Sequence, residues 1–439
     1  MGVNIRSWSA ALAMCTALSL PSAGAVADVL FENVTLIDGT GAAPVPGASV
    51  LVKGDRIDIV SAGPIKHDRG VQVIDGRGKF LMPGLIDSHI HLGANTITDA
   101  NSPEQHLLGV QALHGYLYSG VTAVYDSGNL ADYIFKIRDE ERAGKFVAPR
   151  VFASGTSVSA PTGYGASPRA LQVIDWNTAR PILDAYFKNR KPDLQKIVID
   201  RHNFAVENLT KVVRLANENG VRTTVHAAAE EDYNDALAAG VDEFAHLIRS
   251  EVSAPLVKLL AARGTPMSST QIVFNYIERI AEDTSFLDEP LFKATLDPVL
   301  ITRQKGPERQ RYIDSGMSAQ FKATNAIGLG NAKKLHDAGG VIVLGTDRAW
   351  GPTVHMELAL LHGAGIPLLD LTRIVTLNGA VYLGQEKNLG SIQRGKLADL
   401  LLLNADPTKD VKNFAAIAAV YKGGQKIDFA KLDIPANRK

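Results

Sequence analysis

The feature that most constrains the fold of this chain is an alternation of apolar runs with helix-length segments over residues 83–387. Parallel strands with helices on both faces are buried on both sides, so they are apolar along their whole length. Eight strand–helix units of this kind close into a barrel. We therefore predict an α/β fold, a (β/α)8 TIM barrel over residues 83–387. The runs are FLMPGLIDSHIHL, VTAVYDSG, RVFASG, LQKIVID, VRTTVHAAA, VDEFAHL, GTPMSST and VIVLGTD.

Both ends of the chain outside this region have the pattern of short antiparallel strands. Residues 28–82 contain Val- and Ile-rich stretches separated by Gly, Asp and Pro, and residues 388–439 contain a matching set. Neither piece has enough strands to bury its apolar face alone. We predict that residues 28–82 and 388–439 pair into one small β-sandwich domain.

The segment between the seventh and eighth runs is longer than one crossover helix requires. It covers residues 271–334, and long connections in compact domains are usually functional. We predict that this segment is a lid-like insertion over the C-terminal face of the barrel.

The first 27 residues have the order of a secretory signal peptide. Arg6 precedes a short apolar run, and small residues including Ala25 and Ala27 follow it. The run is too short to cross about 30 Å of hydrocarbon. Lipid attachment at the single cysteine, Cys15, is the alternative, but a bulky residue precedes it. We predict cleavage near Ala25 or Ala27 and a periplasmic or secreted protein that is not attached to the membrane.

The charge balance limits the kind of partner. The chain has 46 basic and 46 acidic side chains, which removes the electrostatic basis for general nucleic-acid binding. Loss of the signal peptide would leave no cysteine, which excludes disulfides, a Cys nucleophile and a thiolate metal site. We predict a small-molecule substrate; the sequence does not decide between a monomer and a homo-oligomer.

Ionisable side chains gather at the ends of the predicted strands, where TIM barrels build their sites. Residues i and i+2 of a strand point to the same side, so both histidines of H-I-H face the barrel mouth. Each side chain alone has an ordinary explanation, such as a hydrogen-bonded core histidine or a turn aspartate, but one metal site explains all of them. Imidazole nitrogens with carboxylate oxygens suit zinc and related ions. The predicted ligands are His89, His91, Lys196, His226, His246 and Asp347.

These segments resemble the amidohydrolase superfamily over nearly the whole mature chain. The order H-x-H, Lys, His, His, Asp is most similar to its imidazolonepropionase-related and Xaa-Pro dipeptidase-like branch, and LTRIVTLNGAVYLG and LGSIQRGKLADLLLLNADP look like its terminal helix and returning strands. The resemblance implies two divalent metal ions, zinc being expected. It implies that His89, His91 and Asp347 hold one ion, that His226 and His246 hold the other, and that a CO2-derived carbamate on Lys196 bridges them.

Burial near positive charge lowers the pKa of a lysine and favours its reaction with CO2. A competing signal is Glu230, because mononuclear deaminases of the superfamily carry a Glu shortly after the corresponding histidine, His226. Their spacing is typically three residues, and here it is four. We therefore interpret Glu230 as a charge at a helix N-terminus.

A two-metal site supports hydrolysis because the ions acidify a shared water and polarise the scissile carbonyl. We expect Asp347 to take the proton from the attacking hydroxide and deliver it to the leaving nitrogen. The predicted reaction is hydrolysis of an amide C–N bond in a dipeptide or N-acyl amino acid. The alternatives are a cyclic amide or lactone hydrolase, an aminohydrolase, and a catalytically inactive binding barrel.

Residues that contact the substrate are harder to assign. Dipeptidase-like relatives carry a Gly-Gly-His-Gly type loop where this chain has SAPTGYGASP, so Tyr164 replaces a titratable histidine with a phenol. Arg201 and His202 follow the fourth run, and an arginine there can clamp a carboxylate in a bidentate pair. Tyr125 stands where relatives often carry Arg. We keep Tyr164, Arg201 and His202 as candidate substrate contacts.

Overall fold

The computed structural model describes residues 28–93, 97–162, 165, 170–200 and 203–438. The predicted signal peptide lies outside the described residues, as do Tyr164, Arg201 and His202. No helix of the described part combines the length and apolarity that a membrane span requires.

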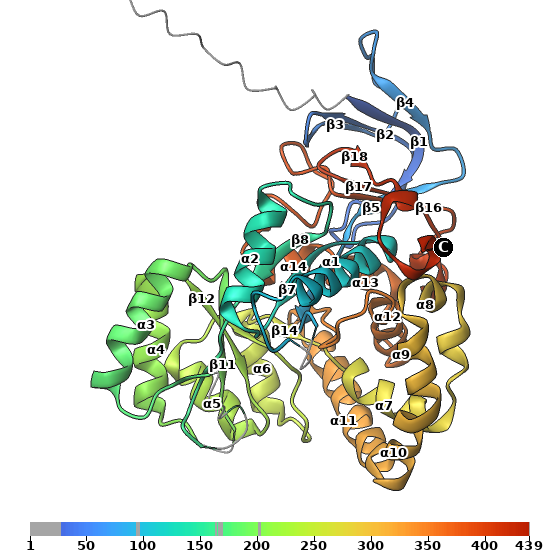
Figure 1. The fold of residues 1–439 in the computed structure, drawn as a ribbon. Helices are drawn as coiled ribbons and strands as arrows, with labels where there is room; N and C mark the ends of the chain where they lie inside the picture. Colours follow the sequence, from blue (N-terminus) through green and yellow to red (C-terminus); the bar gives the residue numbers. More distant parts are fainter. Residues whose placement is uncertain (1–27, 94–96, 163–164, 166–169, 201–202, 439) are drawn as a thin grey trace, which may run out of the picture.

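The two ends of the chain form one continuous sheet, at the top of Figure 1. Its strand order is β18-β17-β16-β5-β1-β2-β3, with β4 beside β1. The ends meet where β5 pairs with β16, with Pro83 opposite Leu400 and Phe80 opposite Leu403. The two ends therefore pair as predicted, in one hydrogen-bonded sheet; that this sheet folds over into a β-sandwich stays a prediction. The strands are β1 (Val29–Leu36), β2 (Val45–Lys53), β3 (Arg56–Ser61), β4 (Gln72–Asp75), β5 (Phe80–Pro83), β16 (Leu400–Leu403), β17 (Ile417–Lys422) and β18 (Gln425–Lys426).

The middle of the chain contains two parallel sheets, and each of the eight predicted runs holds one of their strands. Strands β6, β7 and β11 are buried at every position, as expected for strands covered on both faces. The first sheet is β6 (Leu85–Ile90), β7 (Val121–Asp126) and β8 (Arg150–Ala153). The second is β9 (Val158–Ser159), β10 (Leu171–Gln172), β11 (Leu194–Val198), β12 (Arg222–His226), β13 (Glu243–Phe244), β14 (Met267–Ser268) and β15 (Ile342–Val343).

Backbone hydrogen bonds join the two parallel sheets at both edges. The amide of Asp193, just before β11, donates to the carbonyl of Ala153 in β8 at 3.0 Å. At the other edge, the amide of Ser88 in β6 donates to the carbonyl of Leu344, just after β15, at 2.9 Å. The mixed α/β architecture with parallel strands is thus the predicted one.

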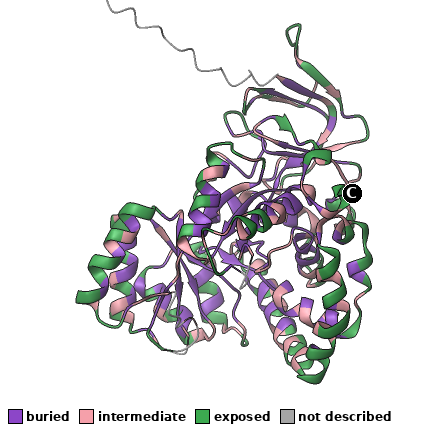
Figure 2. Cartoon of the chain, in the orientation of Figure 1, coloured by how far each residue is buried: buried purple, intermediate pink, exposed green. Residues whose placement is uncertain are grey.

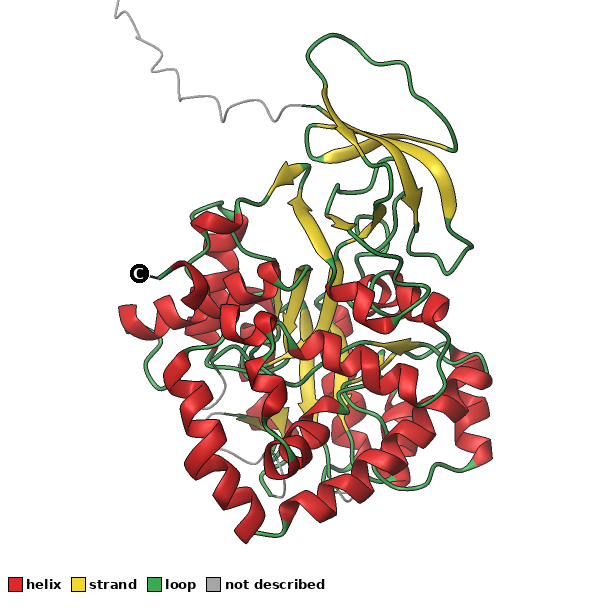
Figure 3. Ribbon diagram, turned by 90° about the vertical axis from the view of Figure 1, so that its right-hand side faces the viewer, coloured by secondary structure: helices red, strands yellow, loops and turns green. Residues whose placement is uncertain are grey.

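Helices alternate with these strands and surround them (Figures 1 and 3). Several of them begin and end at the residues that local chemistry favours. Ser102 accepts from the amide of Gln105 to cap α1, and Gly240 ends α5 in the left-handed conformation. Figure 2 shows buried positions on the strands and on the helix faces that cover them. These helices are α1 (Pro103–Tyr118), α2 (Ala131–Arg142), α3 (Trp176–Arg190), α4 (Val206–Glu218), α5 (Glu230–Ala239), α6 (Ala254–Arg263), α12 (Thr353–Gly363), α13 (Leu368–Ile374) and α14 (Leu377–Tyr382).

The predicted insertion between β14 and β15 is helical, and its apolar side chains form a small core that α12 completes. Its first helix is anchored by buried Glu357 of α12, whose carboxylate accepts from the amides of Gln271 at 3.1 Å and Ile272 at 2.6 Å. A role as a lid stays a prediction. The helices are α7 (Ile272–Glu282), α8 (Pro290–Thr295), α9 (Pro298–Arg303), α10 (Arg309–Asp314) and α11 (Met317–Asp337), and the core includes Tyr276, Ile280, Phe286, Phe292 and Met356.

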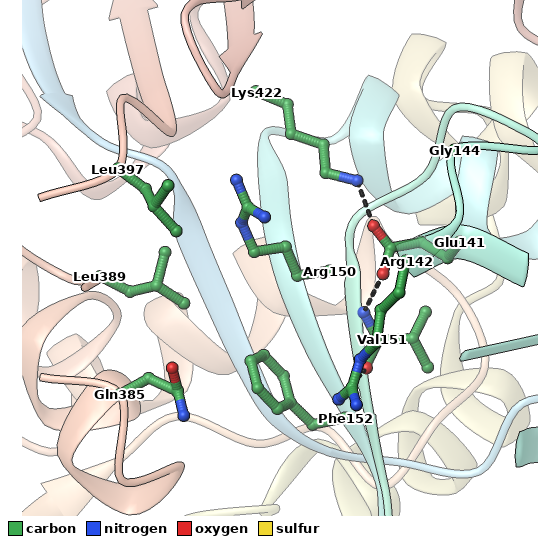
Figure 4. Close-up of a pocket in the computed structure, with 10 residues that line it drawn as sticks. All are labelled: Glu141, Arg142, Gly144, Arg150, Val151, Phe152, Gln385, Leu389, Leu397 and Lys422. Atoms are coloured by element: carbon green, nitrogen blue, oxygen red, sulfur yellow. Dashed lines mark hydrogen bonds and ion pairs between the residues drawn. The ribbon is translucent and has the colours of Figure 1, made fainter. Parts of the chain in front are cut away.

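A cavity of about 370 Å³ lies between the start of β8 and the terminal sheet (Figure 4). Because β5 leads directly into β6, the parallel strands begin on this side of the molecule and end on the other. The charged side chains around the cavity form ion pairs and so connect the terminal sheet with the region of parallel strands. The pairs are Arg150 with Asp399, Arg142 with Asp193, and Lys422 with Glu141.

The contribution of these ion pairs to stability can be tested at Arg150, whose guanidinium donates to both carboxylate oxygens of Asp399 at 2.6 and 2.9 Å. An Arg150→Met variant leaves a carboxylate that is only 4% exposed without its cation. We expect the free energy of unfolding to fall by about 3 kcal/mol, measured by urea titration. The control is Arg214→Met, which breaks an exposed pair with Glu218 and should cost less than about 1 kcal/mol. Equal effects of the two substitutions would contradict the structural role of the Arg150 pair.

Candidate metal centre

The six predicted ligands lie at or beside the C-terminal ends of the parallel strands. Lys196 is on β11, His89 is on β6 and His226 is the last residue of β12, whereas the other three follow β6, β13 and β15. Nε2 of His91 lies 3.3 Å from Oδ1 of Asp347. Nε2 of His89 lies 3.7 Å from the same oxygen.

The imidazole rings are packed against one another. The ring centroids of His89 and His246 are 4.6 Å apart, and those of His226 and His246 are also 4.6 Å apart. One ligand atom from each of His89, His246 and Asp347 lies within 4.8 Å of the others, so a single ion can reach all three. The strands therefore bring together side chains that are widely separated in the sequence.

Burial keeps these histidines uncharged. It holds the pKa of His89, His226 and His246 well below the ordinary value, because the imidazolium form loses its hydration. The positive charge of Lys196 lowers the pKa of all three histidines further. Neutral imidazole is the form that binds a metal ion.

The hydrogen bonds of the rings leave nitrogen atoms free to act as ligands. Nδ1 of His91 donates to the carbonyl of Gly128 at 2.8 Å, so its Nε2 faces Asp347. Nδ1 of His246 lies 2.9 Å from Oγ1 of Thr270. Both ring nitrogens of His89 are buried and have no hydrogen-bond partner in the described part of the chain. A buried polar atom without a partner is costly, and a divalent ion would satisfy it, so the residues present fit a metal.

Lys196 is buried beside the histidines. Its Nζ donates to Oγ of Ser127 at 3.1 Å. Burial lowers the pKa of Lys196 to about 7, although the negative charge of Asp347 acts in the opposite direction. A large fraction of this amine is therefore unprotonated near neutral pH, which is the form that reacts with CO2.

The backbone around the centre is strained at two residues. Asp347 has a φ of 52° and Thr270 a φ of 51°, a left-handed conformation that is uncommon for residues other than glycine and costs of order 1–3 kcal/mol. Gly345 is required here, since a Cβ would lie 2.7 Å from Cβ of His89. Strain of this kind persists only where the surroundings fix the conformation, as they do at functional sites.

A buried carboxylate ties the first and last strands together beside the ligands. Asp87 accepts from the amide of Thr346 at 3.0 Å, from its hydroxyl at 2.7 Å, and from the amide of His89 at 3.2 Å. Burial raises the pKa of Asp87 to about 8. This contact fixes the segment that carries Asp347 against the strand that carries His89.

Two other residues considered from the sequence have structural roles. Glu230 begins α5 and accepts from the amide of Ser253, the cap of α6, at 2.9 Å, in agreement with its interpretation as a helix-terminal charge. Tyr125 is fully buried and donates to the carbonyl of Leu194 at 2.8 Å.

Sequence reasoning missed several residues that lie against the centre. Ser127 and Thr270 could have been noticed as hydroxyl residues at the ends of the second and seventh runs. Arg249 comes three residues after His246 and acts electrostatically on Lys196. No local sequence signal separates Arg249 from an ordinary surface arginine.

Comparison with known proteins agrees with this geometry. The sequence profile of the amidohydrolase family matches residues 80–427. The chain belongs to the amidohydrolase family. The predicted superfamily is thereby confirmed, and with it the prediction that the protein is a hydrolase.

Individual relatives are distant but span most of the chain. An imidazolonepropionase of Phocaeicola vulgatus is 23% identical and covers 87% of this chain and 91% of its own length. An ochratoxinase of Aspergillus niger is 24% identical, over 89% of this chain and 84% of the ochratoxinase. A solved Xaa-Pro dipeptidase with bound methionine has a TM-score of 0.72 and 23% identity, with coverage of 92% and 100%. These similarities agree with the predicted branch of the family.

The contact between His246 and Thr270 yields a prediction about metal affinity. Thr270→Val keeps the shape of the side chain but removes the hydroxyl that orients the ring. We expect metal to bind about 10- to 100-fold more weakly, measured by competition with a chromogenic chelator. Thr270→Ser, which keeps the hydroxyl, should remain close to the parent protein. A Val variant with unchanged affinity would show that the contact does not orient the ligand.

Proposed function

We propose that this protein hydrolyses an amide C–N bond of a small molecule at a centre that holds two divalent metal ions. The observation that carries the proposal is the convergence of neutral imidazoles, one carboxylate and a buried amine at the ends of parallel strands. We infer that these strands close as a (β/α)8 barrel, and the hydrogen bonds at both sheet edges support this inference. Nitrogen and oxygen donors favour zinc.

We assign the predicted ligands to two ions. His89, His91 and Asp347 would hold one ion, and His226 and His246 would hold the other. The amine of Lys196 would add CO2 and lose a proton, and the resulting carbamate would supply a further oxygen ligand. The lowered pKa of Lys196 and the neutrality of the surrounding histidines support this arrangement. When bound, the two ions supply an acidified water and a Lewis acid for the scissile carbonyl.

The chain itself supplies proton transfer and positioning. Asp347 is the carboxylate that we assign to the reacting atoms, and its side chain is 20% exposed, so a substrate can reach it. We assign to its carboxylate the transfer of a proton from the attacking water to the leaving nitrogen. The left-handed backbone at Asp347 and the contacts of Asp87 hold this carboxylate in place.

The leading substrate class is a dipeptide or an N-acyl amino acid. The similarity to a Xaa-Pro dipeptidase and to an ochratoxinase supports a linear amide. Opening of a cyclic amide is the second candidate, and it is favoured by the similarity to an imidazolonepropionase, since an imidazolone is a cyclic amide. The same water and the same carboxylate serve both reactions.

The role of Asp347 is tested by Asp347→Asn. The amide cannot accept a proton, so we expect kcat to fall about 10²- to 10⁴-fold while the protein stays folded. Turnover and metal content are measured on the same preparation. The control is Asp370→Asn, which changes a half-exposed carboxylate on α13 that pairs with His336. An Asp347→Asn enzyme that retains metal and the parental rate would overturn the role assignment.

The substrate class is tested with a panel of dipeptides, N-acyl amino acids and cyclic amides in the presence of added zinc. We expect C–N cleavage of linear amides, and loss of that activity after dialysis against a strong chelator. Ring opening without any cleavage of linear amides would establish the second candidate instead. Full activity after removal of metal would contradict the proposal as a whole.

A further inference from the structure

Arg249 is a cationic side chain beside the centre that no described residue neutralises. It follows β13 and lies three residues after His246. Its Nε is buried and has no hydrogen-bond partner among the described residues, and no ion pair between described residues includes Arg249. A buried donor of a charged group is costly to leave unpaired. The side chain therefore has unused capacity to bind an anion.

Other partly buried arginines of the protein are used differently. Arg150 binds both oxygens of Asp399 beside the cavity of Figure 4. Arg138 donates to Asp139 at 2.9 Å and to the carbonyl of Lys191, also at 2.9 Å. These guanidinium groups serve the folded structure, whereas that of Arg249 makes no such contact in the described part of the chain.

Arg348, next to Asp347, is a useful comparison because it also lies near the centre. It donates to the carbonyl of Val273 at 2.8 Å and packs over Tyr276 at 4.6 Å from the ring centroid. A backbone carbonyl therefore satisfies part of its donor capacity. Among the described residues, Arg249 contacts only the face of the Phe274 ring, so the N–H groups at the edge of its guanidinium remain available to bind an anion.

An aromatic ring holds Arg249 in place. Its guanidinium carbon lies 5.1 Å from the ring centroid of Phe274, in the first turn of α7. That turn is fixed by Glu357, and the ring of Phe274 also packs against Phe321 of α11, with the ring centroids 5.4 Å apart. A guanidinium stacked on an aromatic face keeps its N–H groups free for bidentate binding in the plane. The insertion thus supplies a rigid support for the cation.

Arg249 lies close to the centre in the chain, three residues after His246, and it stacks on Phe274 at the start of the helix that follows Thr270. In agreement with this position, its charge lowers the pKa of Lys196, of His226 and of His246. Bound divalent ions would repel this positive charge, and an anionic group of a substrate placed between them and Arg249 would relieve the repulsion. Among common hydrolase substrates, a carboxylate matches the planar fork of a guanidinium.

We propose that Arg249 is a specificity-determining residue that binds the carboxylate of the substrate through two parallel N–H donors. The proposal rests on the proposed amide hydrolysis and deepens it, because it restricts the substrate to amides that carry a free carboxylate. It gives to Arg249 the role that the sequence suggested for Arg201. The insertion of residues 271–334 takes part through Phe274, which holds the guanidinium toward the centre.

The test compares two forms of one substrate, an N-acyl amino acid and its C-terminal primary amide, in the parent enzyme and in Arg249→Met. In the parent enzyme we expect kcat/KM to favour the carboxylate form by about 100-fold. In Arg249→Met this preference should fall to within about threefold of unity, mainly through a higher KM for the carboxylate form. Arg249→Lys, which keeps the charge but not the planar fork, should retain an intermediate preference.

The outcomes separate the two proposals. If the parent enzyme cleaves neither form, the proposed function fails. If the parent enzyme cleaves both and Arg249→Met keeps the same preference, the role of Arg249 is overturned while the function stands. Metal content is measured in every variant. An Arg249→Met protein that loses its metal together with both activities would show that Arg249 stabilises the centre, which also overturns its assignment to the substrate.

Discussion

The structure depends on one constraint, the cost of removing ionisable side chains from water. At the ends of the parallel strands the chain buries neutral imidazoles, an amine whose pKa is lowered to about 7, and a carboxylate whose pKa is raised to about 8. Each of these groups would be unfavourable alone. The imidazoles and the amine form a set of donors whose protonation states suit divalent cations, whereas Asp87 fixes the strands that carry them. The backbone strain at Asp347 and Thr270 is concentrated at the same place.

Much of the fold and of the centre was predictable because the signals were local. Each predicted strand is a short apolar run, and His89, His226 and Lys196 lie within such runs. The C-terminal ends of parallel strands meet at one edge of a sheet, so side chains that end different runs could be expected to lie close together. The pairing of the chain ends followed from the need of each short piece for partner strands.

The remaining features depend on contacts between distant segments, which no local pattern carries. That Asp87 would bind Thr346 depends on how the first and last parallel strands adjoin. The length of the insertion indicated an extra element, but not that Glu357 would anchor its first turn across 85 positions. The position of Arg249 on the ring of Phe274 depends on two segments that are not adjacent in the sequence, so no local pattern indicated it.

The pairing of β5 with β16 has a consequence for the order of events during biosynthesis. The strand that leads into the first two histidines finds its antiparallel partner only in Leu400–Leu403, near the end of the chain. A nascent polypeptide that still lacks those residues leaves that edge open, and contacts so far apart slow the search for the native topology. The edge of β5 is therefore paired late, because the strand that covers it follows the whole region of parallel strands in the sequence.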